Sequence, residues 1–461
     1  MCEEKHVTLE DMLEAKDARV SRQRAFLEKT GRPLISMTLN MAGPVKRTRL
    51  SSFFFQRELK NIEALLQGMR ADFEVSLYSS HTGDEALFAI HALTAIALKR
   101  FCVDLEEHAP YARLLDLDVI DEKSIPMSRK SLQWPERRCL VCEQPASICA
   151  SRAAHDIKIV QAKTESLLSG YARMVLADDM ASLAMEASAF ELMIHPKPGL
   201  VTAFSQGSHR DMDRFTFIKS QSSFSPYYRG CFDIGWDRDL SLQEKAVDLR
   251  RQGILAEARM NELTGGVNTH RGWIYLSGIL LAVTGDYLAS ILVEDQGELI
   301  EDAIIAFMKR AAVQYSKALE SSLEEVPYFS ALDRSLNESS AITGIRKEAV
   351  NGCPGLFTTG LQVLKGSLDR KEDENTAGQR ALLAILSVIE DTTLVKRAGE
   401  KRASMIIRDL QAKLGDSELE STMEELVLTF SQHGLNAGGA ADLLAGSRYV
   451  QRFLEYAVTD L

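Results

Sequence analysis

Ile35-Ser36-Met37-Thr38-Leu39-Asn40-Met41 is a stretch in which apolar and polar residues alternate. A period of two places successive side chains on opposite faces of a strand, so this segment predicts a half-buried β-strand. The same alternation occurs from Phe73 to Tyr78 and from Leu115 to Val119, and a long helical stretch is expected between them from about Asp84 to Glu107. Strands and helices mixed in this way predict an α/β or α+β layer for the first third of the chain.

The rest of the chain has a different pattern. From about Ile157 onward, long segments rich in Ala, Leu, Met and Glu predict helices, for example from Leu167 to Ile194 and from Gln379 to Glu390. The length of 461 residues exceeds the size at which one hydrophobic core stops growing. We therefore predict two domains, an N-terminal α/β or α+β domain over residues 1–160 and a mostly α-helical domain over residues 165–461, with the boundary between about 151 and 169.

Composition and charge exclude several classes of protein. The net charge of -11 disfavours broad nucleic-acid binding, which needs Lys and Arg to replace phosphate counterions. Neither a long uninterrupted apolar run nor a basic, apolar leader at the N-terminus is seen, so neither membrane insertion nor export is expected. Three of the seven cysteines crowd into residues 139–149, which is typical of a reducing compartment, and we expect a cytoplasmic protein.

Asp116 and Asp118 lie two residues apart on a predicted strand, so their carboxylates leave the same face and can converge on one cation. Mg²⁺ held by one or two carboxylates, with water and substrate phosphate at its other positions, is the usual arrangement in phosphoryl chemistry. The same Asp-x-Asp pattern also occurs on the solvated face of an edge strand, and the pattern alone does not decide between the two.

A second cluster offers soft ligands. Cys139, Cys142, Cys149 and His155 have the ligand types of a tetrahedral Zn²⁺ site, which would be structural because four protein ligands leave no open position. The alternative is that the thiols are small buried residues that pack as apolar groups. Five basic residues lie near this cluster: Arg129, Lys130, Arg137, Arg138 and Arg152. They form either a solvated face or a docking patch for an acidic carrier protein.

Three N-terminal segments resemble, in this order, the citrate lyase holo-acyl-carrier-protein synthase family: Asn40-Met41-Ala42-Gly43-Pro44-Val45-Lys46, Arg113-Leu114-Leu115-Asp116-Leu117-Asp118-Val119 and Arg138-Cys139-Leu140-Val141-Cys142. The resemblance covers about residues 10–160. It implies transfer of a phosphoribosyl-dephospho-CoA group from its triphosphate precursor to a serine of the carrier, with release of diphosphate. On this basis Asp116 and Asp118 are expected to hold Mg²⁺, while Lys46 and Arg113 neutralise charge on the leaving diphosphate.

Five segments interrupt the predicted helices with Gly, Pro, His and Asp: His195-Pro196-Lys197-Pro198-Gly199-Leu200-Val201, Gly207-Ser208-His209-Arg210-Asp211-Met212-Asp213, Thr264-Gly265-Gly266-Val267-Asn268-Thr269-His270-Arg271-Gly272, Thr343-Gly344-Ile345-Arg346-Lys347-Glu348-Ala349 and Asn436-Ala437-Gly438-Gly439-Ala440-Ala441-Asp442-Leu443-Leu444-Ala445. Each alone predicts no more than a turn. Together and in this order they resemble the triphosphoribosyl-dephospho-CoA synthase family, from about residue 168 to the end. The resemblance implies that a ribose hydroxyl of 3'-dephospho-CoA attacks the sugar carbon of ATP, and that adenine leaves while the triphosphate is retained.

Such a glycosyl transfer needs a base, an acid and cations around the triphosphate. Phosphate contacts are expected from Lys197, Arg271 and Arg346. Mg²⁺ binding or proton transfer is expected from Asp211, Asp213 and Glu348, and positioning or acid–base work from His209 and His270. Further substrate contacts are expected from Gly199, Asn268, Thr269, Gly438, Gly439 and Asp442, although the last three equally suit a tight turn before a helix.

The two resemblances together predict a bifunctional transferase, with the holo-acyl-carrier-protein synthase over residues 1–160 and the triphosphoribosyl-dephospho-CoA synthase over residues 165–461. Its expected partners are ATP, 3'-dephospho-CoA and the apo-acyl carrier subunit of citrate lyase, with Mg²⁺ as cofactor and structural Zn²⁺ left open. Two alternatives stand beside this reading. The N-terminal part is a non-catalytic carrier-docking module, or both activities serve malonate decarboxylase.

Overall fold

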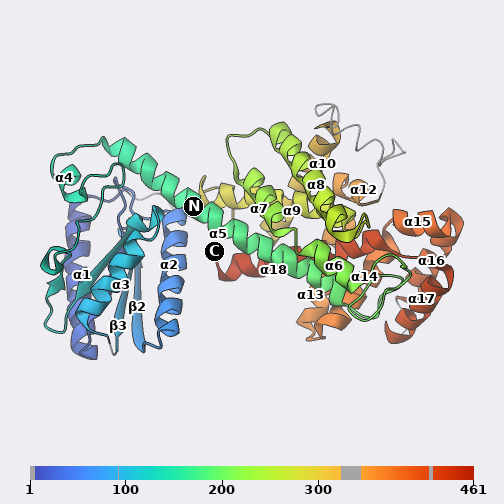
Figure 1. Cartoon of the computed structure of the whole chain (residues 1–461), viewed down its shortest axis with the longest axis horizontal. Helices are drawn as coiled ribbons and strands as arrows, with labels where there is room; N and C mark the ends of the chain where they lie inside the picture. Colours follow the sequence, from blue (N-terminus) through green and yellow to red (C-terminus); the bar gives the residue numbers. More distant parts are fainter. Residues whose placement is uncertain (1–5, 92, 323–343, 415–418) are drawn as a thin grey trace. The chain divides into compact units, whose positions relative to one another are not determined.

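A computed structural model describes residues 6–91, 93–322, 344–414 and 419–461 (Figure 1). The chain divides into two compact units, Met1–Met174 and Val175–Leu461. The division falls inside one long helix, α5 (Ile157–Met193). The structure therefore has two units, one with a small sheet and one built from helices.

Unit 1 contains a five-stranded sheet with the order β2-β3-β1-β4-β5. Its strands are β1 (Leu34–Leu39), β2 (Phe73–Ser80), β3 (Gly83–Ile90), β4 (Leu115–Ile120) and β5 (Pro126–Met127). All neighbouring pairs are antiparallel. The three alternating segments thus form β1, β2 and β4, as the period of two predicts.

Helices cover both faces of this sheet. These are α1 (Leu9–Thr30), α2 (Arg49–Gly68) and α3 (Ala95–Glu107), and α1 and α2 lie on opposite sides of the strands (Figure 1). Phe26 and Leu27 of α1 pack in one buried cluster with Leu34 of β1. Because of this double cover, β1 is buried along most of its length, and the half-buried strand expected from the sequence is wrong in this respect.

The helix expected from Asp84 to Glu107 is wrong in its first part. Residues 83–90 form β3, and only residues 95–107 form a helix, α3. Gly83 has a φ of 127°, which permits the turn from β2 into β3. Ala86 to Ile90 are all buried, since β3 is paired on both sides and covered on both faces, so the period of two is absent from this strand.

Unit 2 is helical in its described residues. After α5 come α6 (Arg214–Gln221), α7 (Ser225–Trp236), α8 (Leu242–Thr264), α9 (Arg271–Leu292), α10 (Glu301–Ser321) and α12 (Gly344–Val350). The later helices are α13 (Leu361–Asp369), α14 (Glu374–Val388), α15 (Thr392–Ala398), α16 (Glu400–Lys413), α17 (Leu419–His433) and α18 (Gly438–Thr459). The helices expected at Leu167–Ile194 and Gln379–Glu390 are confirmed in α5 and α14.

Helix α9 is the core of unit 2 and contacts α7, α8, α10 and α18. By length and composition it is apolar enough to cross a membrane, but 83% of its apolar window is buried inside the structure. A Cβ at Gly235 of α7 would lie 1.9 Å from the carbonyl oxygen of Ala282 in α9. Glycine is therefore required there, because the two helices approach each other at backbone distance.

Candidate functional site

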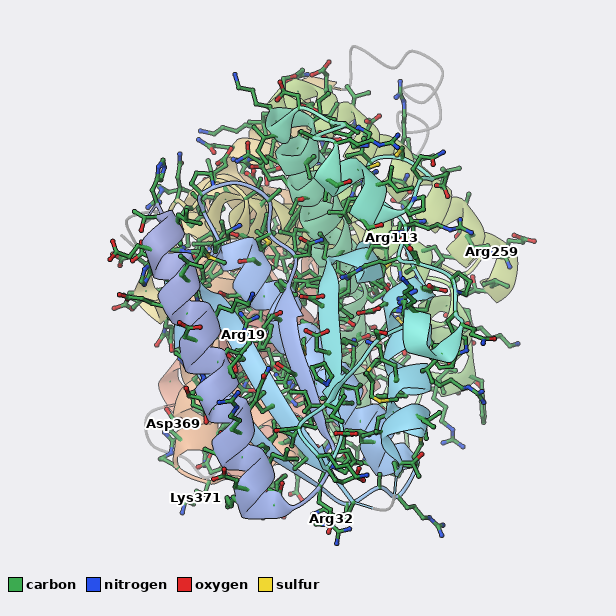
Figure 2. All side chains as sticks on the ribbon, turned by 90° about the vertical axis from the view of Figure 1, so that its left-hand side faces the viewer. Arg19, Arg32, Arg113, Arg259, Asp369 and Lys371 are labelled. Carbon is green, nitrogen blue, oxygen red and sulfur yellow. The ribbon has the colours of Figure 1, made fainter. Side chains whose placement is uncertain are left out.

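The two carboxylates of unit 1 lie on β4 opposite β1, where Asp116 faces Thr38 and Asp118 faces Ser36. Both leave the sheet on the face that α1 covers, because Gln23 of α1 donates from Nε2 to Ser36 Oγ at 3.0 Å. Figure 2 views the sheet with α1 in front of it. Asp116 is half-buried and Asp118 is exposed.

Arg137, which the sequence placed in a solvated face or a docking patch, binds Asp116. Arg137 donates from Nη1 to Asp116 Oδ1 at 3.0 Å, and from Nη2 to the carbonyl oxygen of Arg113 at 2.9 Å and to that of Leu115. Arg113, at the entry to β4 (Figure 2), donates in turn from Nη1 to the carbonyl oxygen of Cys139 at 3.3 Å. The two arginines therefore tie residues 137–139 to the start of β4.

Electrostatics favour a cation beside this pair. The pKa of Asp118 is raised, although part of its side chain is in contact with solvent. The larger cause is desolvation by the surrounding protein, and the second is the negative charge of Asp116. A bound divalent ion would relieve this repulsion. Among the described residues, no third metal-ligating side chain converges with the two aspartates, so water or substrate would fill the other ligand positions.

Lys46 lies in the loop between β1 and α2. Its Nζ donates to the carbonyl oxygen of Met41 at 2.6 Å, and burial lowers the pKa of Lys46. This loop begins at the carboxyl end of β1. In the antiparallel register that end of β1 lies next to the start of β4. Lys46 thus belongs to the same end of the sheet as Arg113.

Cys139, Cys142, Cys149 and His155 converge, and their ligand atoms all lie within 4.8 Å of one another. The Cys142 Sγ atom is 3.5 Å from Cys149 Sγ and 3.3 Å from His155 Nε2. Cys149 lies on the short helix α4 (Ala146–Ser151). Four soft ligands at this spacing can hold one tetrahedral metal ion.

In unit 2, all five predicted segments approach the N-terminus of α18. The Nδ2 atom of Asn436, just before α18, lies 2.8 Å from His209 Nε2. Gly199 packs so closely that a Cβ there would lie 2.0 Å from the carbonyl oxygen of Leu435. A Cβ at Gly344 would lie 2.7 Å from Thr392 Oγ1, beside the start of α15. Thr343, which opens the fourth segment in the sequence, lies outside the described residues.

Asp442 joins α18 to the third segment at the N-terminus of α9. Its Oδ2 atom lies 1.9 Å from the position that a Cβ at Gly272 would take, and the backbone N–H of Trp273 donates to the carboxylate. Desolvation, and then the charges of Glu191 and Asp391, raise the pKa of Asp442 well above its usual range. Burial among acidic groups thus disfavours the charged form of this carboxyl group.

Asp391 was not in the predicted set, although it stands at the centre of this region. Its Oδ1 accepts from the N–H groups of Thr393 and Leu394 at 2.9 and 3.0 Å, and its Oδ2 accepts from Ala440 N at 3.0 Å. One buried carboxylate therefore caps both α15 and α18. A Cβ at Gly439 would lie 3.1 Å from Asp391 Oδ2, so Gly439 leaves room for this contact.

Glu348 lines a cavity together with Asp391. This small cavity is also lined by Gly344 and Gly439, among others. The Oε2 atom of Glu348 accepts from Gly355 N at 2.9 Å, and burial raises the pKa of Glu348. A second cavity, between α14 and α16, contains none of the predicted site residues.

Lys197 is buried in an ion pair. Its Nζ donates to the carbonyl oxygen of Glu191 at 2.5 Å and also to the Glu191 carboxylate. Burial lowers the pKa of Lys197, while the Glu191 charge opposes that change. In this structure Lys197 holds the loop to the end of α5 instead of projecting into solvent.

The two predicted arginines of unit 2 also have acidic partners. Arg271 donates from Nε to Glu257 Oε2 at 3.1 Å, and Arg346 donates from Nε to Glu320 Oε1 at 2.9 Å. Both side chains are partly exposed, with 38% and 26% of their surface accessible. Nearby, Asn268 Oδ1 accepts from the backbone N–H of Arg271 at 3.1 Å and so caps the start of α9.

His270 is buried and neutral. Its Nδ1 lies 2.9 Å from Ser220 Oγ and 2.9 Å from Thr269 Oγ1. Desolvation lowers the pKa of His270 to about 3. This ring can position its neighbours, but it does not carry a transferable proton near neutral pH.

The second segment places its three predicted site residues, His209, Asp211 and Asp213, in different surroundings. His209 is half-buried, and this desolvation lowers its pKa; the Arg397 charge lowers it further, while Asp211 opposes both effects. Asp211 is exposed, and its Oδ1 lies 3.8 Å from His209 Nδ1. Asp213 caps α6, because its Oδ1 accepts from Thr216 N at 2.9 Å. Asp213 therefore has a structural contact, whereas His209 and Asp211 stay near the start of α18.

Glu191 and Asp391 were not among the predicted site residues, and Arg137 was expected only in a solvated face or a docking patch. Arg137 and Asp391 contact residues 21 and 49 positions away, so no local spacing identifies these contacts, whereas Glu191 pairs with Lys197 six positions later. Two weak signals were available. Arg137 lies two residues before Cys139, and Asp391 follows the predicted helix of α14 in the sequence Asp-Thr-Thr, which is typical of a helix N-cap.

Comparisons with known proteins match both units. The family model described as apo-citrate lyase phosphoribosyl-dephospho-CoA transferase matches residues 7–171, and the one described as ATP:dephospho-CoA triphosphoribosyl transferase matches residues 177–459. The chain is 30% identical to Protein CitXG of Haemophilus influenzae, over 95% of both chains. It is 26% identical to Protein CitXG of Leuconostoc mesenteroides subsp. cremoris, over 91% of both.

A shorter relative aligns with the second unit alone. The 2-(5''-triphosphoribosyl)-3'-dephosphocoenzyme-A synthase of Escherichia fergusonii is 29% identical over 291 residues, which are 61% of this chain and 92% of the relative. The matches thus cover the two units in the order in which they occur along the chain.

Proposed function

Because this chain belongs to the family of CitXG proteins, we propose that it makes the prosthetic group of citrate lyase in unit 2 and attaches it in unit 1. Unit 2 condenses ATP with 3'-dephospho-CoA and releases adenine. Unit 1 then transfers the phosphoribosyl-dephospho-CoA group to a serine of the acyl carrier subunit and releases diphosphate. The observation that carries this function is that both family models match this chain, which is also similar over 95% of its length to Protein CitXG of Haemophilus influenzae.

In unit 1 the serine hydroxyl attacks the α-phosphate, and the bond to diphosphate breaks. Asp116 and Asp118 would hold Mg²⁺, which screens phosphate charge when bound. Arg113 and Lys46 lie at the same end of the sheet and would neutralise the leaving diphosphate. We add Arg137 to this set, because it already binds Asp116 and orients the backbone of Arg113.

In unit 2 the ribose hydroxyl attacks the sugar carbon of ATP, and the bond to adenine breaks. We assign Asp442 as the acid that protonates the departing adenine, supported by its raised pKa at the N-terminus of α9. Glu348 and Asp391 line the neighbouring cavity and would bind Mg²⁺ or accept the hydroxyl proton. Arg271 and Arg346 are accessible enough to exchange their acidic partners for phosphate oxygens.

The cytoplasm is the proposed location. The six cysteines in the described part of the chain are free thiols, as a reducing compartment requires, and the most apolar helix is a core helix.

The direct test incubates the purified protein with ATP, 3'-dephospho-CoA and Mg²⁺, with and without the apo-carrier of citrate lyase. Free adenine and the intact mass of the carrier are followed. Adenine release together with a carrier mass gain equal to one phosphoribosyl-dephospho-CoA group is expected. Absence of adenine release would contradict the assignment of unit 2.

Two further arms separate the alternatives. The double variant Asp116→Asn with Asp118→Asn should abolish carrier modification and leave adenine release unchanged, whereas a non-catalytic docking module predicts intact transfer. Glu122→Gln, an exposed change between β4 and β5, is the matched control and should behave like wild type.

The apo-carrier of malonate decarboxylase should be modified more slowly than that of citrate lyase, and the opposite order would reassign the carrier.

A further inference from the structure

The cysteine cluster of unit 1 is a preformed site for a soft metal ion. Three thiols and one imidazole bring their ligand atoms within 4.8 Å of one another. Ligands around a tetrahedral zinc ion, at about 2.3 Å from the metal for sulfur, lie roughly 3.8 Å from one another. The separations of 3.5 Å between Cys142 Sγ and Cys149 Sγ and of 3.3 Å between Cys142 Sγ and His155 Nε2 are close to that value.

The backbone around the first two cysteines forms a tight turn. Cys139 N donates to the carbonyl oxygen of Gln144 at 2.8 Å, and Ala146 N donates to that of Arg137 at 2.8 Å. Inside the turn, Val141 N donates to Cys139 Sγ at 3.4 Å, which favours a thiolate at that position. Thiols that pack only as apolar residues do not need an N–H donor or a histidine partner.

This segment has little other reason to be ordered. Between β5 and α5 the described regular structure consists of a single 3₁₀ turn and the six-residue helix α4. Small loop-rich segments of this kind are commonly stabilised by a disulfide or by a metal ion. The described cysteines are free, which leaves the metal.

The turn is connected to the transfer site from both sides. Arg137 lies two residues before Cys139 and binds Asp116 at 3.0 Å. Arg113 in turn donates to the carbonyl oxygen of Cys139 itself, at 3.3 Å. The geometry of the cysteine turn therefore decides where both guanidinium groups lie.

We infer that Cys139, Cys142, Cys149 and His155 bind one Zn²⁺ ion, and that this ion positions Arg113 and Arg137 at the phosphate-transfer site of unit 1. With four protein ligands the ion has no open position for water or substrate, so its role is structural. Its loss would release the turn and, with it, the two arginines. The second part of the inference rests on the proposed transfer function, whereas the metal site does not.

The metal site is tested on the full-length protein after any affinity tag has been removed. Elemental analysis should find about one zinc ion per chain, as expected for one four-ligand site. Replacement by Co²⁺ should give the absorption of a tetrahedral cobalt ion with thiolate ligands. Cys142→Ser should lose the metal, and Cys102→Ala, a buried thiol of α3 outside the cluster, should keep it. Wild-type protein without zinc, or with a disulfide within the cluster, would overturn the site.

The positioning role is tested by comparing the two half-reactions of one protein. Removal of zinc, or Cys142→Ser, should slow carrier modification by about tenfold or more, as is usual when support around a site is lost. Adenine release should stay unchanged, and it reports that unit 2 remains folded. His155→Cys replaces one zinc ligand by another and should keep both zinc and transfer. Zinc loss with intact transfer would overturn the positioning role.

Hydrogen exchange tests the same coupling without any catalytic readout. Zinc removal should increase amide exchange in residues 111–118, which contain Arg113 and Asp116, and leave β2 unchanged. If the wild type binds zinc and shows this coupling but modifies no carrier, the proposed function fails and the zinc-held turn stands. Unchanged exchange in residues 111–118 would contradict the coupling.

Discussion

The Oδ2 atom of Asp442 occupies the space that a side chain at Gly272 would need, 1.9 Å from the ideal Cβ position. A carboxylate from α18 thereby reaches the first turn of α9, where the N–H of Trp273 donates to it. Only glycine permits this approach, because any Cβ would displace the carboxylate.

Gly272→Ala should therefore slow adenine release by about tenfold or more, since an acidic group moved by an ångström loses much of its catalytic effect. When the assay is supplied with triphosphoribosyl-dephospho-CoA, the rate of carrier modification by this variant should not change. Gly253→Ala in α8 is the matched control, because nothing lies within 4 Å of its ideal Cβ. That control should keep full activity and gain up to about 1 kcal/mol of stability. Equal adenine release by Gly272→Ala and wild type would contradict the role of Asp442.

Arg137→Lys should reduce carrier modification, because lysine has a single ammonium group and cannot bind Asp116 and two carbonyl oxygens in a fixed plane. We expect a loss of about 10-fold to 100-fold in the transfer rate, with adenine release unchanged. The neighbouring Arg138→Lys is the control, since Arg138 pairs with an exposed Glu143 at 2.8 Å. A similar loss in both variants would contradict a specific role for the contacts of Arg137 with Asp116 and the two carbonyl oxygens.

Lys197→Met should destabilise unit 2 by about 3–5 kcal/mol, because it leaves the Glu191 carboxylate buried without its partner. The double variant Lys197→Met with Glu191→Leu should recover most of that loss, since no unpaired charge remains. Denaturation by urea, followed by tryptophan fluorescence, measures both. Lys219→Met, an exposed change on α6, should shift the free energy of unfolding by less than about 0.5 kcal/mol. A single variant as stable as wild type would mean that the pair is not needed for folding.

His270 should make the stability of unit 2 depend on pH. Its pKa is about 3 in the folded protein, against 6.5 ordinarily, so between these values the unfolded chain binds a proton that the folded chain does not. The stabilisation from burying neutral His270 is fully present above pH 6.5 and is lost as the pH falls toward 3. In that range the free energy of unfolding falls with a slope that approaches about 1.4 kcal/mol per pH unit. His270→Asn should lower the steepness of this loss between pH 6.5 and 5, measured by urea denaturation.

His433→Asn serves as the control for this pH dependence, because His433 is exposed at the end of α17. It should leave the slope of stability against pH unchanged. Identical slopes for His270→Asn and wild type would show that His270 takes up a proton in the folded state.

The sequence by itself determined the strands β1, β2 and β4, the long helices of unit 2 and the ligand types of the cysteine cluster. These are local properties, because side-chain period and residue spacing are fixed within a few residues of the chain. The ordered series of motifs also placed two activities along the chain, and the family matches confirm them.

Only the tertiary structure decided the contacts between distant segments. β3 is a strand because it pairs with β1 and β2, although its buried run lacks the alternation of a half-buried strand. Arg137 reaches Asp116 across 21 positions, and Asp391 caps α18 across 49. Lys197, which stays a predicted phosphate contact, forms a buried pair with Glu191. Such partners are selected by the packing of whole helices and sheets, because the free energy of burying a charge depends on what surrounds it and not on its neighbours in sequence.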